Sequence, residues 1–449
     1  MIDVEVIETS SLGDRSYLAT DGEVAVVVDP QRDVDRVLAL AGRLGVRISH
    51  VVETHVHNDY VSGGLELARL TGAAYVMSAQ DDVAFARTGV VDGDVLEASP
   101  RLRLRVLATP GHTFHHLSYV LEGADGPHGG FTGGSLLYGT TGRTDLLGDE
   151  HAQTLARELP ADTPVYPTHG FGSFCTASPA SGNESTVGNE KEVNPVLRLA
   201  RDEFVRHTLA GLGAYPAYYA HMGALNTAGP APVDLRPPTT ADPAELARRL
   251  AAGEWVVDLR HRKAYLDSHL TGTVSLGLDG PMATWLGWMA PHGAPITLLG
   301  EDRAQVAQAQ RELVRIGVDH VVAAATGEPG DLADAAQLAG LPSASFADLA
   351  AELSGRRLAD LPPAQVVLDV RLGTEWNASH IRGAVHIPLP ELDARLAEVP
   401  DGAVWVHCGS GYRATAAASL LARAGRTVVV VDDMFDDAAD GGVPLTPTS

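Results

Sequence analysis

The chain has 449 residues, of which 45% are hydrophobic and 20% are charged, and its formal net charge is −24 at pH 7. At roughly 100–200 residues per domain, this length is too great for one hydrophobic core and predicts about two to four domains. The acidic balance argues against a nucleic acid or an anionic membrane surface as partner.

The two cysteines, Cys175 and Cys408, lie far apart in unrelated sequence contexts. This usage excludes a disulfide scaffold and indicates a reducing compartment. The first residues alternate polar and apolar side chains, without the charged-then-apolar order of a signal peptide, and no apolar run reaches the length of a membrane span. We therefore expect a cytoplasmic protein with no membrane partner.

Short strand patterns separated by turns dominate residues 1–120, as in VAVVVDP and LRLRVLATPG. Amphipathic helices are predicted between some of them, over Asp33–Leu44 and Gly63–Thr71. Strands mixed with helices indicate an α/β domain. The polar, Gly- and Ser-rich stretch 172–194 predicts a loop.

Metal-ligating residue types follow predicted strands at three places in this first part. The tight turn that contains His55 and His57 also offers Asp59 two residues later. Further imidazoles come from His112 in Pro-Gly-His-Thr and from His169 in Thr-His-Gly. Loops at one sheet edge can gather such side chains, and imidazole with carboxylate suits zinc or iron. A single surface histidine usually binds nothing, but this ordered combination predicts a metal site.

The second half of the chain contains an internal repeat. Before it, Asn226–Asp242 is rich in Pro, Thr and Ala and predicts an extended linker with few contacts, and a second boundary is expected near 335–345. The motifs Asp258-Leu-Arg, Tyr265 and Ser268-His-Leu recur 111 residues later as Asp369-Val-Arg, Trp376 and Ser379-His-Ile. A fixed offset over several residue types predicts a duplicated α/β domain.

A candidate nucleophile, Cys408, lies between the apolar strand pattern AVWVH and a helix rich in Ala and Leu. The loop continues through Gly409, Ser410, Gly411, Tyr412 and Arg413. Inward-pointing backbone N–H groups and the positive end of the helix would favour the thiolate, and Arg413 could hold an oxyanion. The alternative is a buried core cysteine. We expect Cys408 and Arg413 to be catalytic.

The earlier copy differs at the corresponding place. Its predicted strand, Pro295–Leu299, runs into the shorter segment Gly300–Arg303, which has no cysteine. This copy therefore lacks the candidate thiol nucleophile, and we expect a structural or docking domain. A retained anion site is the alternative.

The last part of the chain resembles the rhodanese family over about residues 345–445. The resemblance rests on Asp369–Arg371, Glu375, His380–Ala384, Ile387-Pro388 and the loop Cys408–Arg413. It implies sulfur transfer through a persulfide on Cys408. The six-residue loop resembles that of the single-domain form that handles sulfane sulfur.

The first part resembles the metallo-β-lactamase superfamily over about residues 1–220, and more narrowly the persulfide dioxygenases. Thr109–Thr113, Phe131–Gly133, Gly142–Asp145 and Gly170–Cys175 carry the narrower match. The resemblance implies an αββα sandwich that holds one ferrous ion by two histidines and one carboxylate. His55 and His112 are the ligand positions that carry over.

The sequence departs from that family at two positions. Gly134 replaces the family's Asp after Phe-Thr-Gly, and Tyr60 replaces a second-metal His. A bridged dinuclear zinc site is therefore not expected. A mononuclear site of His55, His57 and His112 stays open, as does rescue by Asp59 or His169. A metal-poor domain that only binds thiols is the third alternative.

Arg143 and Cys175 are expected in a substrate loop beside this site. Arg143 and Asp145 would shape the site, or form an ordinary buried ion pair. Cys175 would receive or relay persulfide sulfur, or be an inert thiol.

Together these observations predict an α/β chain in three parts: a metallo-β-lactamase-like domain over 1–230, a degenerate rhodanese-like domain over 240–335, and a rhodanese domain over 345–449. The expected enzyme couples a sulfurtransferase to a persulfide dioxygenase with one metal ion, Fe(II) in preference to Zn(II). Its expected partners are a small thiol persulfide, thiosulfate or sulfite, and the resemblance implies a homo-oligomer. A metal-dependent thioester hydrolase, or a sulfurtransferase with an inactive N-terminal domain, are the alternatives.

Overall fold

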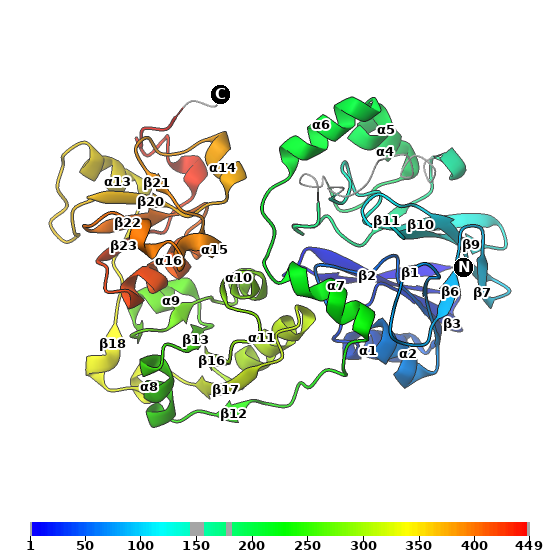
Figure 1. The fold of residues 1–449 in the computed structure, drawn as a ribbon, viewed down its shortest axis with the longest axis horizontal. Coiled ribbons are helices and arrows are strands. Elements are labelled where there is room, and N and C mark those ends of the chain that lie inside the picture. The colour runs from blue at the N-terminus through cyan, green and yellow to red at the C-terminus, as the bar shows by residue number, and fades with distance from the viewer. Residues whose placement is uncertain (1, 144–156, 177–181, 447–449) are drawn as a thin grey trace. The chain divides into compact units, whose positions relative to one another are not determined.

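The computed structural model describes residues 2–143, 157–176 and 182–446, and its elements are labelled in Figure 1. The chain divides into two compact units. Unit 1 comprises Met1–Asp234 with Val314–Gly317, and unit 2 comprises Leu235–Leu313 with Val318–Ser449. Each unit is described by itself.

The first sheet of unit 1 has the strand order β1-β2-β3-β4-β5-β6. Its strands are β1 (Asp3–Thr9), β2 (Asp14–Thr20), β3 (Val24–Val28), β4 (Arg47–Val52), β5 (Ala74–Ser78) and β6 (Thr88–Val90). The helices α1 (Asp35–Leu44) and α2 (Gly64–Thr71) confirm the two amphipathic predictions. Both helices pack on one face of this sheet through an apolar cluster that includes Val37, Leu67 and the strand residue Val27.

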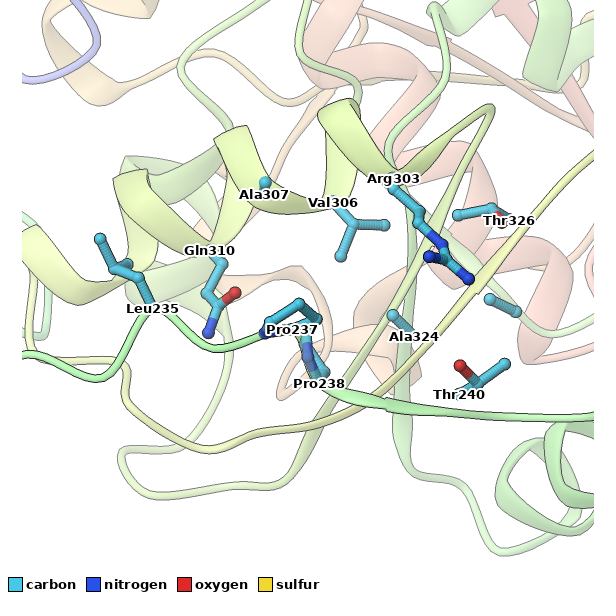
Figure 2. A pocket seen from close by; sticks show the side chains of 11 residues that line it. Leu235, Pro237, Pro238, Thr240, Arg303, Val306, Ala307, Gln310, Ala324 and Thr326 are labelled. Atoms are coloured by element: carbon cyan, nitrogen blue, oxygen red, sulfur yellow. The ribbon is translucent and has the colours of Figure 1, made fainter.

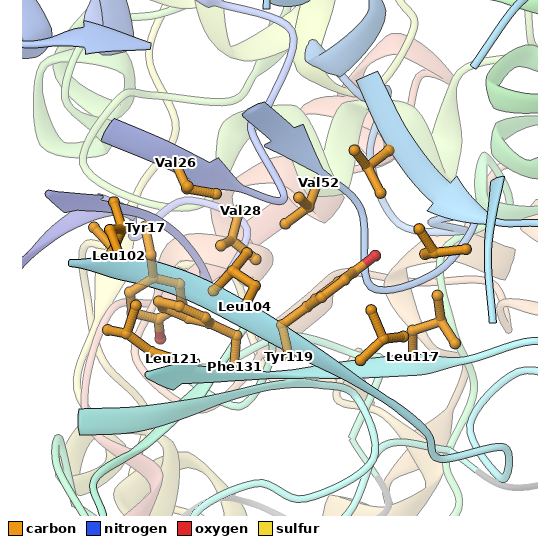
Figure 3. Close-up of a cluster of buried hydrophobic side chains, with 14 residues drawn as sticks. Tyr17, Val26, Val28, Val52, Leu102, Leu104, Leu117, Tyr119, Leu121 and Phe131 are labelled. Carbon is orange, nitrogen blue, oxygen red and sulfur yellow. The ribbon is translucent and has the colours of Figure 1, made fainter. Parts of the chain in front are cut away.

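The second sheet has the order β11-β10-β9-β8-β7. Its strands are β7 (Val95–Ser99), β8 (Leu102–Ala108), β9 (Leu117–Gly123), β10 (Gly126–Gly133) and β11 (Val165–Pro167). Successive side chains of a strand point to opposite faces, so in β3 Val26 and Val28 face away from Val27. They join the core between the two sheets, where Figure 3 shows them with Leu104, Tyr119 and Phe131.

Helices cover the outer face of the second sheet. They include α4 (Val187–Val193), α5 (Pro195–Arg198) and α6 (Arg201–Gly211), whose Val187, Val196 and Phe204 pack with Val120 and Val165 of the strands. The layers are therefore helix, sheet, sheet and helix, which confirms the predicted αββα sandwich.

Unit 2 contains two five-stranded parallel sheets of matching order. The first is β12-β17-β16-β13-β15 and the second is β19-β23-β22-β20-β21. The first sheet is made of β12 (Thr239–Thr240), β13 (Trp255–Asp258), β15 (Val274–Ser275), β16 (Ile296–Gly300) and β17 (Val321–Thr326). The second is made of β19 (Ser343–Ala344), β20 (Val366–Asp369), β21 (Val385–His386), β22 (Val404–His407) and β23 (Val428–Val431).

Helices connect these parallel strands, as parallel pairing requires. The first copy has α8 (Pro243–Ala251), α9 (Arg262–Asp267), α10 (Met282–Met289), α11 (Arg303–Arg315) and α12 (Pro329–Leu332). The second has α13 (Phe346–Leu353), α14 (Gly373–Ala378), α15 (Leu389–Leu392) and α16 (Tyr412–Arg423). A short pair, β14 (His269–Leu270) and β18 (Leu338–Ala339), lies apart from both sheets.

The predicted duplication is repeated in individual contacts. Arg260 donates to Asp258 at 2.7 Å and to the Ser268 carbonyl at 2.8 Å. Arg371 makes the same two bonds, at 2.7 Å each, to Asp369 and the Ser379 carbonyl. Because buried charges are tolerated only when paired, this arginine–carboxylate pair is a structural element that both copies retain.

Two loop predictions were partly wrong. The segment Asn226–Asp242 does not begin as an extended linker, because Asn226 lies in α7 (Tyr219–Ala228). Its buried amide donates to the carbonyls of His57 and Tyr60 at 2.8 and 2.9 Å. Within the polar stretch 172–194, α4 forms a helix capped by the Thr186 side chain. Helix-capping residues and glycines gave this stretch the composition of a loop.

In the part of the chain that the structure describes, no helix combines the length and apolar character needed to cross a membrane.

Candidate functional site

The five predicted metal-ligating side chains of unit 1 gather in one cluster, in which His112 is half-buried and the other four are buried. His55, His57 and Asp59 follow β4, His112 follows β8, and His169 follows β11. The ring centroids of His55 and His112 are 4.9 Å apart, and those of His55 and His169 are 5.3 Å apart. The expectation that loops would bring these residues to one place agrees with this geometry.

Two trios of ligand atoms share His169. The first trio consists of His55, His112 and His169, and the second of His57, Asp59 and His169. In each trio the ligand atoms lie within 4.8 Å of one another. Within the first trio, the Nε2 atoms of His55 and His169 are 3.3 Å apart. Imidazole nitrogens at this separation, removed from solvent, are typical of a metal site.

Two carboxylates lie behind His169. Its Nδ1 is 3.0 Å from Asp14 and 3.0 Å from Asp59. Burial disfavours a charged ring, but the two carboxylates raise the pKa of His169 well above its usual value. Burial and the neighbouring Asp59 raise the pKa of Asp14 to about 7. This carboxylate pair compensates positive charge in the pocket.

A second acidic cluster surrounds His57. Its Nε2 lies 3.0 Å from the Tyr60 hydroxyl, 3.3 Å from Asp29 and 3.2 Å from Glu53. Although burial lowers it, the pKa of His57 is raised to about 9 by these two carboxylates. The Tyr60 hydroxyl thus positions His57.

Gly134 makes room for the His112 ring. A Cβ at Gly134 would lie 2.6 Å from Cγ and 2.8 Å from Nε2 of His112, and a Cβ at Gly142 would lie 2.5 Å from its Nδ1. The ring therefore fills the space in which a side chain at 134 would stand. The sequence predicted that no side chain at position 134 could bind a metal. The structure adds that the His112 imidazole fills the space such a side chain would take.

The residues present fit a metal ion. Among the residues that the structure describes, Nδ1 of His57 and Oδ1 of Asp59 are buried atoms with no hydrogen-bond partner. Buried polar atoms of this kind need an explanation, and a bound ion is one. Burial lowers the pKa of His55 well below its usual value, and burial with the nearby His169 lowers that of His112 to about 4. Neutral imidazoles can ligate.

The two residues predicted for the substrate loop, Cys175 and Arg143, make different contacts. Cys175 is buried beside the pocket, and burial together with Asp59 and Asp14 raises the pKa of its thiol well above the usual value. Arg143 directs its guanidinium to the Gly213 carbonyl at 2.8 Å, while its own carbonyl is 2.9 Å from Nδ1 of His112. Its backbone thus orients His112. Asp145 lies outside the described residues.

The predicted nucleophile of unit 2 has the expected setting. Cys408 follows β22 and precedes α16, and it is 1% exposed. The backbone N–H groups of Ser410 and Gly411 point to its sulfur at 3.5 and 3.2 Å. Gly411 adopts a φ of +90°, which a glycine can reach without strain. This turn directs the two donors at the sulfur.

Arg413 is held beside the thiol by Glu375. Its two terminal nitrogens donate to the Glu375 carboxylate at 2.5 and 2.7 Å, and this pairing raises the pKa of Arg413 despite its burial. A bidentate pair fixes the orientation of a guanidinium as well as its charge. Glu375 belongs to the motif by which the sequence resembles the rhodanese family, but its contact with Arg413 was not predicted. Asp14, Asp29 and Glu53 were missed altogether.

The first copy of unit 2 supports the loop of the second. The Tyr412 hydroxyl donates to the Gly277 carbonyl at 2.9 Å, and the Arg413 guanidinium lies 5.6 Å from the centre of the Trp285 ring. Gly280 is directly below the Tyr412 ring, because a Cβ there would lie 2.6 Å from Cδ2. The copy without a cysteine therefore shapes the surroundings of the cysteine in the other.

A Gly280→Ala substitution is expected to displace Tyr412 and, through it, Arg413. We expect unit 2 to lose about 1–3 kcal/mol of unfolding free energy, as overpacking costs, and sulfur transfer to slow. Urea unfolding and thiosulfate:cyanide assays measure both effects. Gly330→Ala is the matched control, since a Cβ at that position meets no atom within 4 Å. Equal behaviour of the two variants would contradict the prediction.

A hollow of about 250 Å³ in the first copy is lined by none of the candidate site residues. Figure 2 shows it between α11 and the segment that leads into β12, with Arg303, Val306 and Gln310 along one side. Arg303 ends the shortened loop that replaces the cysteine loop in this copy. The lining contains no thiol, so this copy offers no second nucleophile there.

Comparison with known families agrees with this architecture. The model of the metallo-beta-lactamase superfamily matches residues 15–169, and that of the rhodanese-like domain matches residues 349–437. The mitochondrial persulfide dioxygenase of Homo sapiens is 34% identical over 208 residues, covering 44% of this chain and 74% of that protein. A hydroxyacylglutathione hydrolase of Polaromonas is 31% identical over 206 residues, covering 39% of this chain and 77% of that protein.

A solved structure, a metallo-beta-lactamase from Staphylococcus aureus, is similar over a greater part of the chain. It has a TM-score of 0.62 and 27% identity, and the match covers 72% of this chain and 98% of that one. Fold and site thus define a metallo-β-lactamase-type domain with a rhodanese-like domain near the C-terminus. The chain belongs to the metallo-β-lactamase superfamily, with persulfide dioxygenases among its homologues, and it is a fusion with a rhodanese-like domain near the C-terminus.

Proposed function

We propose that the chain is a bifunctional enzyme of sulfur metabolism. Unit 1 would oxidise a small thiol persulfide at one metal ion, and unit 2 would transfer sulfane sulfur through Cys408. The observation that carries the proposal is the presence, in one chain, of a buried imidazole–carboxylate pocket and a cysteine loop whose backbone N–H groups point at sulfur. The proposed domain boundaries are 1–230, 240–335 and 345–449.

Sulfur transfer at Cys408 is a balanced exchange of sulfur–sulfur bonds. The thiolate attacks the outer sulfur of thiosulfate, a bond forms between the two sulfurs, and sulfite leaves with the electron pair of the broken bond. Arg413, held by Glu375, neutralises the incoming anion, and the N–H groups of Ser410 and Gly411 stabilise negative charge at sulfur. An acceptor thiolate or cyanide then removes the carried sulfur.

In unit 1 the protein supplies binding, orientation and charge compensation. A ferrous ion in the pocket would supply the redox chemistry that O₂ requires, which is why Fe(II) is proposed in preference to Zn(II). Overall, one persulfide, one O₂ and one water give one thiol, one sulfite and two protons. The sulfite released is a sulfur acceptor for Cys408, and the covalent link between the units raises its effective concentration.

Thioester hydrolysis is the second candidate for unit 1, favoured by the similarity to hydroxyacylglutathione hydrolases. Tyr60 in the place of a second-metal histidine weighs against it, because the tyrosine hydroxyl contacts His57.

Oxygen uptake distinguishes the candidates. The metal-loaded protein is expected to consume O₂ with glutathione persulfide and to form sulfite, whereas hydroxyacylglutathione should be hydrolysed no faster than in buffer. Chelator-treated protein is the control and should consume no O₂. Thioester hydrolysis without O₂ uptake would replace the proposed oxidation with the second candidate.

A further inference from the structure

We infer that Arg262, in the copy without a cysteine, is a positioning residue for the cysteine loop of the other copy. It holds and neutralises the carboxylate of Asp432, which lies against Gly411 beside the sulfur. This inference rests on the proposed role of Cys408 as a nucleophile, and it adds a residue on which the ionised sulfur depends. Arg262 begins α9 of the first copy, and Asp432 directly follows β23 of the second.

The ion pair links the two copies directly. Nε of Arg262 donates to Oδ1 of Asp432 at 2.9 Å, and its Nη1 donates to Oδ2 of Asp279 at 2.7 Å. The side chains of Arg262 and Asp432 are 22% and 10% exposed, so salt screens this pair less than it screens a pair on the open surface. Burial lowers the pKa of Arg262, but the two carboxylates raise it above its usual value. The guanidinium therefore stays charged.

Asp432 packs on the turn that contacts the sulfur. A Cβ at Gly411 would lie 2.9 Å from Cγ of Asp432, so the carboxylate fills the space in which a side chain at 411 would stand. On its other side, Gly411 directs its backbone N–H to the Cys408 sulfur at 3.2 Å. A change in the place or the charge of this carboxylate is therefore transmitted to the sulfur across a single residue.

The other charged groups around the cysteine loop are already balanced. Arg413 is paired with Glu375 at 2.5 and 2.7 Å. Asp369 is paired with Arg371 at 2.7 Å. The carboxylate of Asp433 accepts two backbone N–H groups, at 3.1 and 2.9 Å. None of these groups needs Arg262.

Asp432 does need it. Among the residues that the structure describes, Arg262 is the charged partner of this carboxylate. His407, which precedes the cysteine, cannot replace it, because burial lowers the pKa of that ring to about 4 and leaves it neutral at pH 7. Without the charge of Arg262, a bare carboxylate would lie beside Gly411. A negative charge at that place disfavours the thiolate relative to the thiol.

The pair is not one of the features that the two copies share. At the offset of 111 residues, Arg262 corresponds to Gly373. The matching strand registers place Thr326 where the second copy has Asp432. The pair thus joins an arginine found only in the first copy to a carboxylate found only in the second. It occurs once, next to the thiol, as expected if it supports the thiol and not the fold of either copy.

Alkylation of Cys408 measures the thiolate without requiring sulfur transfer. Full-length protein is treated with iodoacetamide over a range of pH values, and mass spectrometry follows the peptide that contains Cys408. Arg262→Gln should slow alkylation at pH 7 about three- to tenfold and move the rise of the rate to higher pH, because the uncompensated carboxylate of Asp432 opposes the thiolate. Arg262→Lys keeps the charge and should largely retain the wild-type rate.

Substitution of the carboxylate separates charge from packing. Asp432→Asn keeps the contact with Gly411 but removes the negative charge, so this variant should not be alkylated more slowly than the wild type. The double variant, Arg262→Gln with Asp432→Asn, should recover the wild-type rate. Arg248→Gln is the matched control and should change nothing, since that arginine pairs with Glu245 within α8 at 2.8 Å. Thermal unfolding shows whether each variant is folded.

Two results would overturn the inference. One is a wild-type alkylation rate in Arg262→Gln. The other is equal slowing in both single variants and the double variant, which would make the pair a mere structural link. If Arg262→Gln does not fold, Asp432→Asn decides alone, because slower alkylation of that variant contradicts a repulsive carboxylate. A wild type that follows the expected alkylation pattern but carries no sulfur after thiosulfate treatment would refute the proposed sulfur transfer and leave the role of Arg262 intact.

Discussion

A Cys408→Ser variant is expected to lose thiosulfate:cyanide sulfur transfer down to the uncatalysed rate. Serine fits the loop and keeps the two N–H contacts, but a hydroxyl is a far weaker nucleophile and cannot carry sulfur as a persulfide. The backbone N–H groups of Ser410 and Gly411 and the charge of Arg413 would remain in place without a sulfur to act on. The assay is the rate of thiocyanate formation.

Mass spectrometry after thiosulfate treatment locates the carried sulfur. The peptide that contains Cys408 should gain the mass of one sulfur atom in the wild type. The peptide that contains Cys175 should not, because burial and the nearby carboxylates of Asp59 and Asp14 raise the pKa of that thiol. The urea midpoint of the variant should match the wild type. Sulfur transfer that persists in folded Cys408→Ser protein would refute the assignment of this residue.

Gly134→Ala is expected to weaken metal binding by at least about 10–100-fold. Loss of a residue that only supports a ligand has an effect of this size, and this substitution would displace a candidate ligand, His112, itself. The backbone at this position suits any residue, but the new Cβ would lie 2.6 Å from Cγ of His112. The ring must therefore leave the trio, and overpacking should cost about 1–3 kcal/mol of unfolding free energy. Isothermal titration with Zn(II) measures the affinity.

Gly134→Asp should behave like the alanine variant, even though it restores the carboxylate of the family motif, because its Cβ meets the same ring. Gly42→Ala is the matched control: this glycine lies in α1, and a Cβ there meets no atom within 4 Å. If Gly134→Asp instead bound metal more tightly than the wild type, the native pocket would be a weakened form of the family's site and His112 would be free to move.

The sequence was sufficient for the architecture and for the members of the pocket. Strand patterns followed by histidines located His55, His112 and His169, since residues that follow strands collect where those strands end. The repeat at a fixed offset predicted a duplicated α/β domain, and the structure has two sheets of matching order with the same Asp–Arg pair. These features have local patterns, and local patterns can be recognised in one sequence.

The partners of those residues could not be predicted in the same way. Asp14, Asp29 and Glu53 come from separate strands or their ends, and each looks like an ordinary charged residue in its own sequence surroundings. Only tertiary packing brings Asp14 across to His169, 155 positions along the chain. Asp29 offered a usable signal in the sequence, because it is a carboxylate directly after the apolar run Val24–Val28. In the structure its backbone lies in the left-handed region.

The contact between Tyr412 and Gly277 has a consequence for the modularity of this chain. A stretch cut to the boundaries of the rhodanese family match would expose the aromatic ring that Gly280 covers and would lose the indole beside Arg413. The smallest fragment that preserves the surroundings of the thiol is therefore the whole tandem. Selection on sulfur chemistry in the later copy would then act on the earlier copy too, which explains why a domain without a nucleophile keeps its fold.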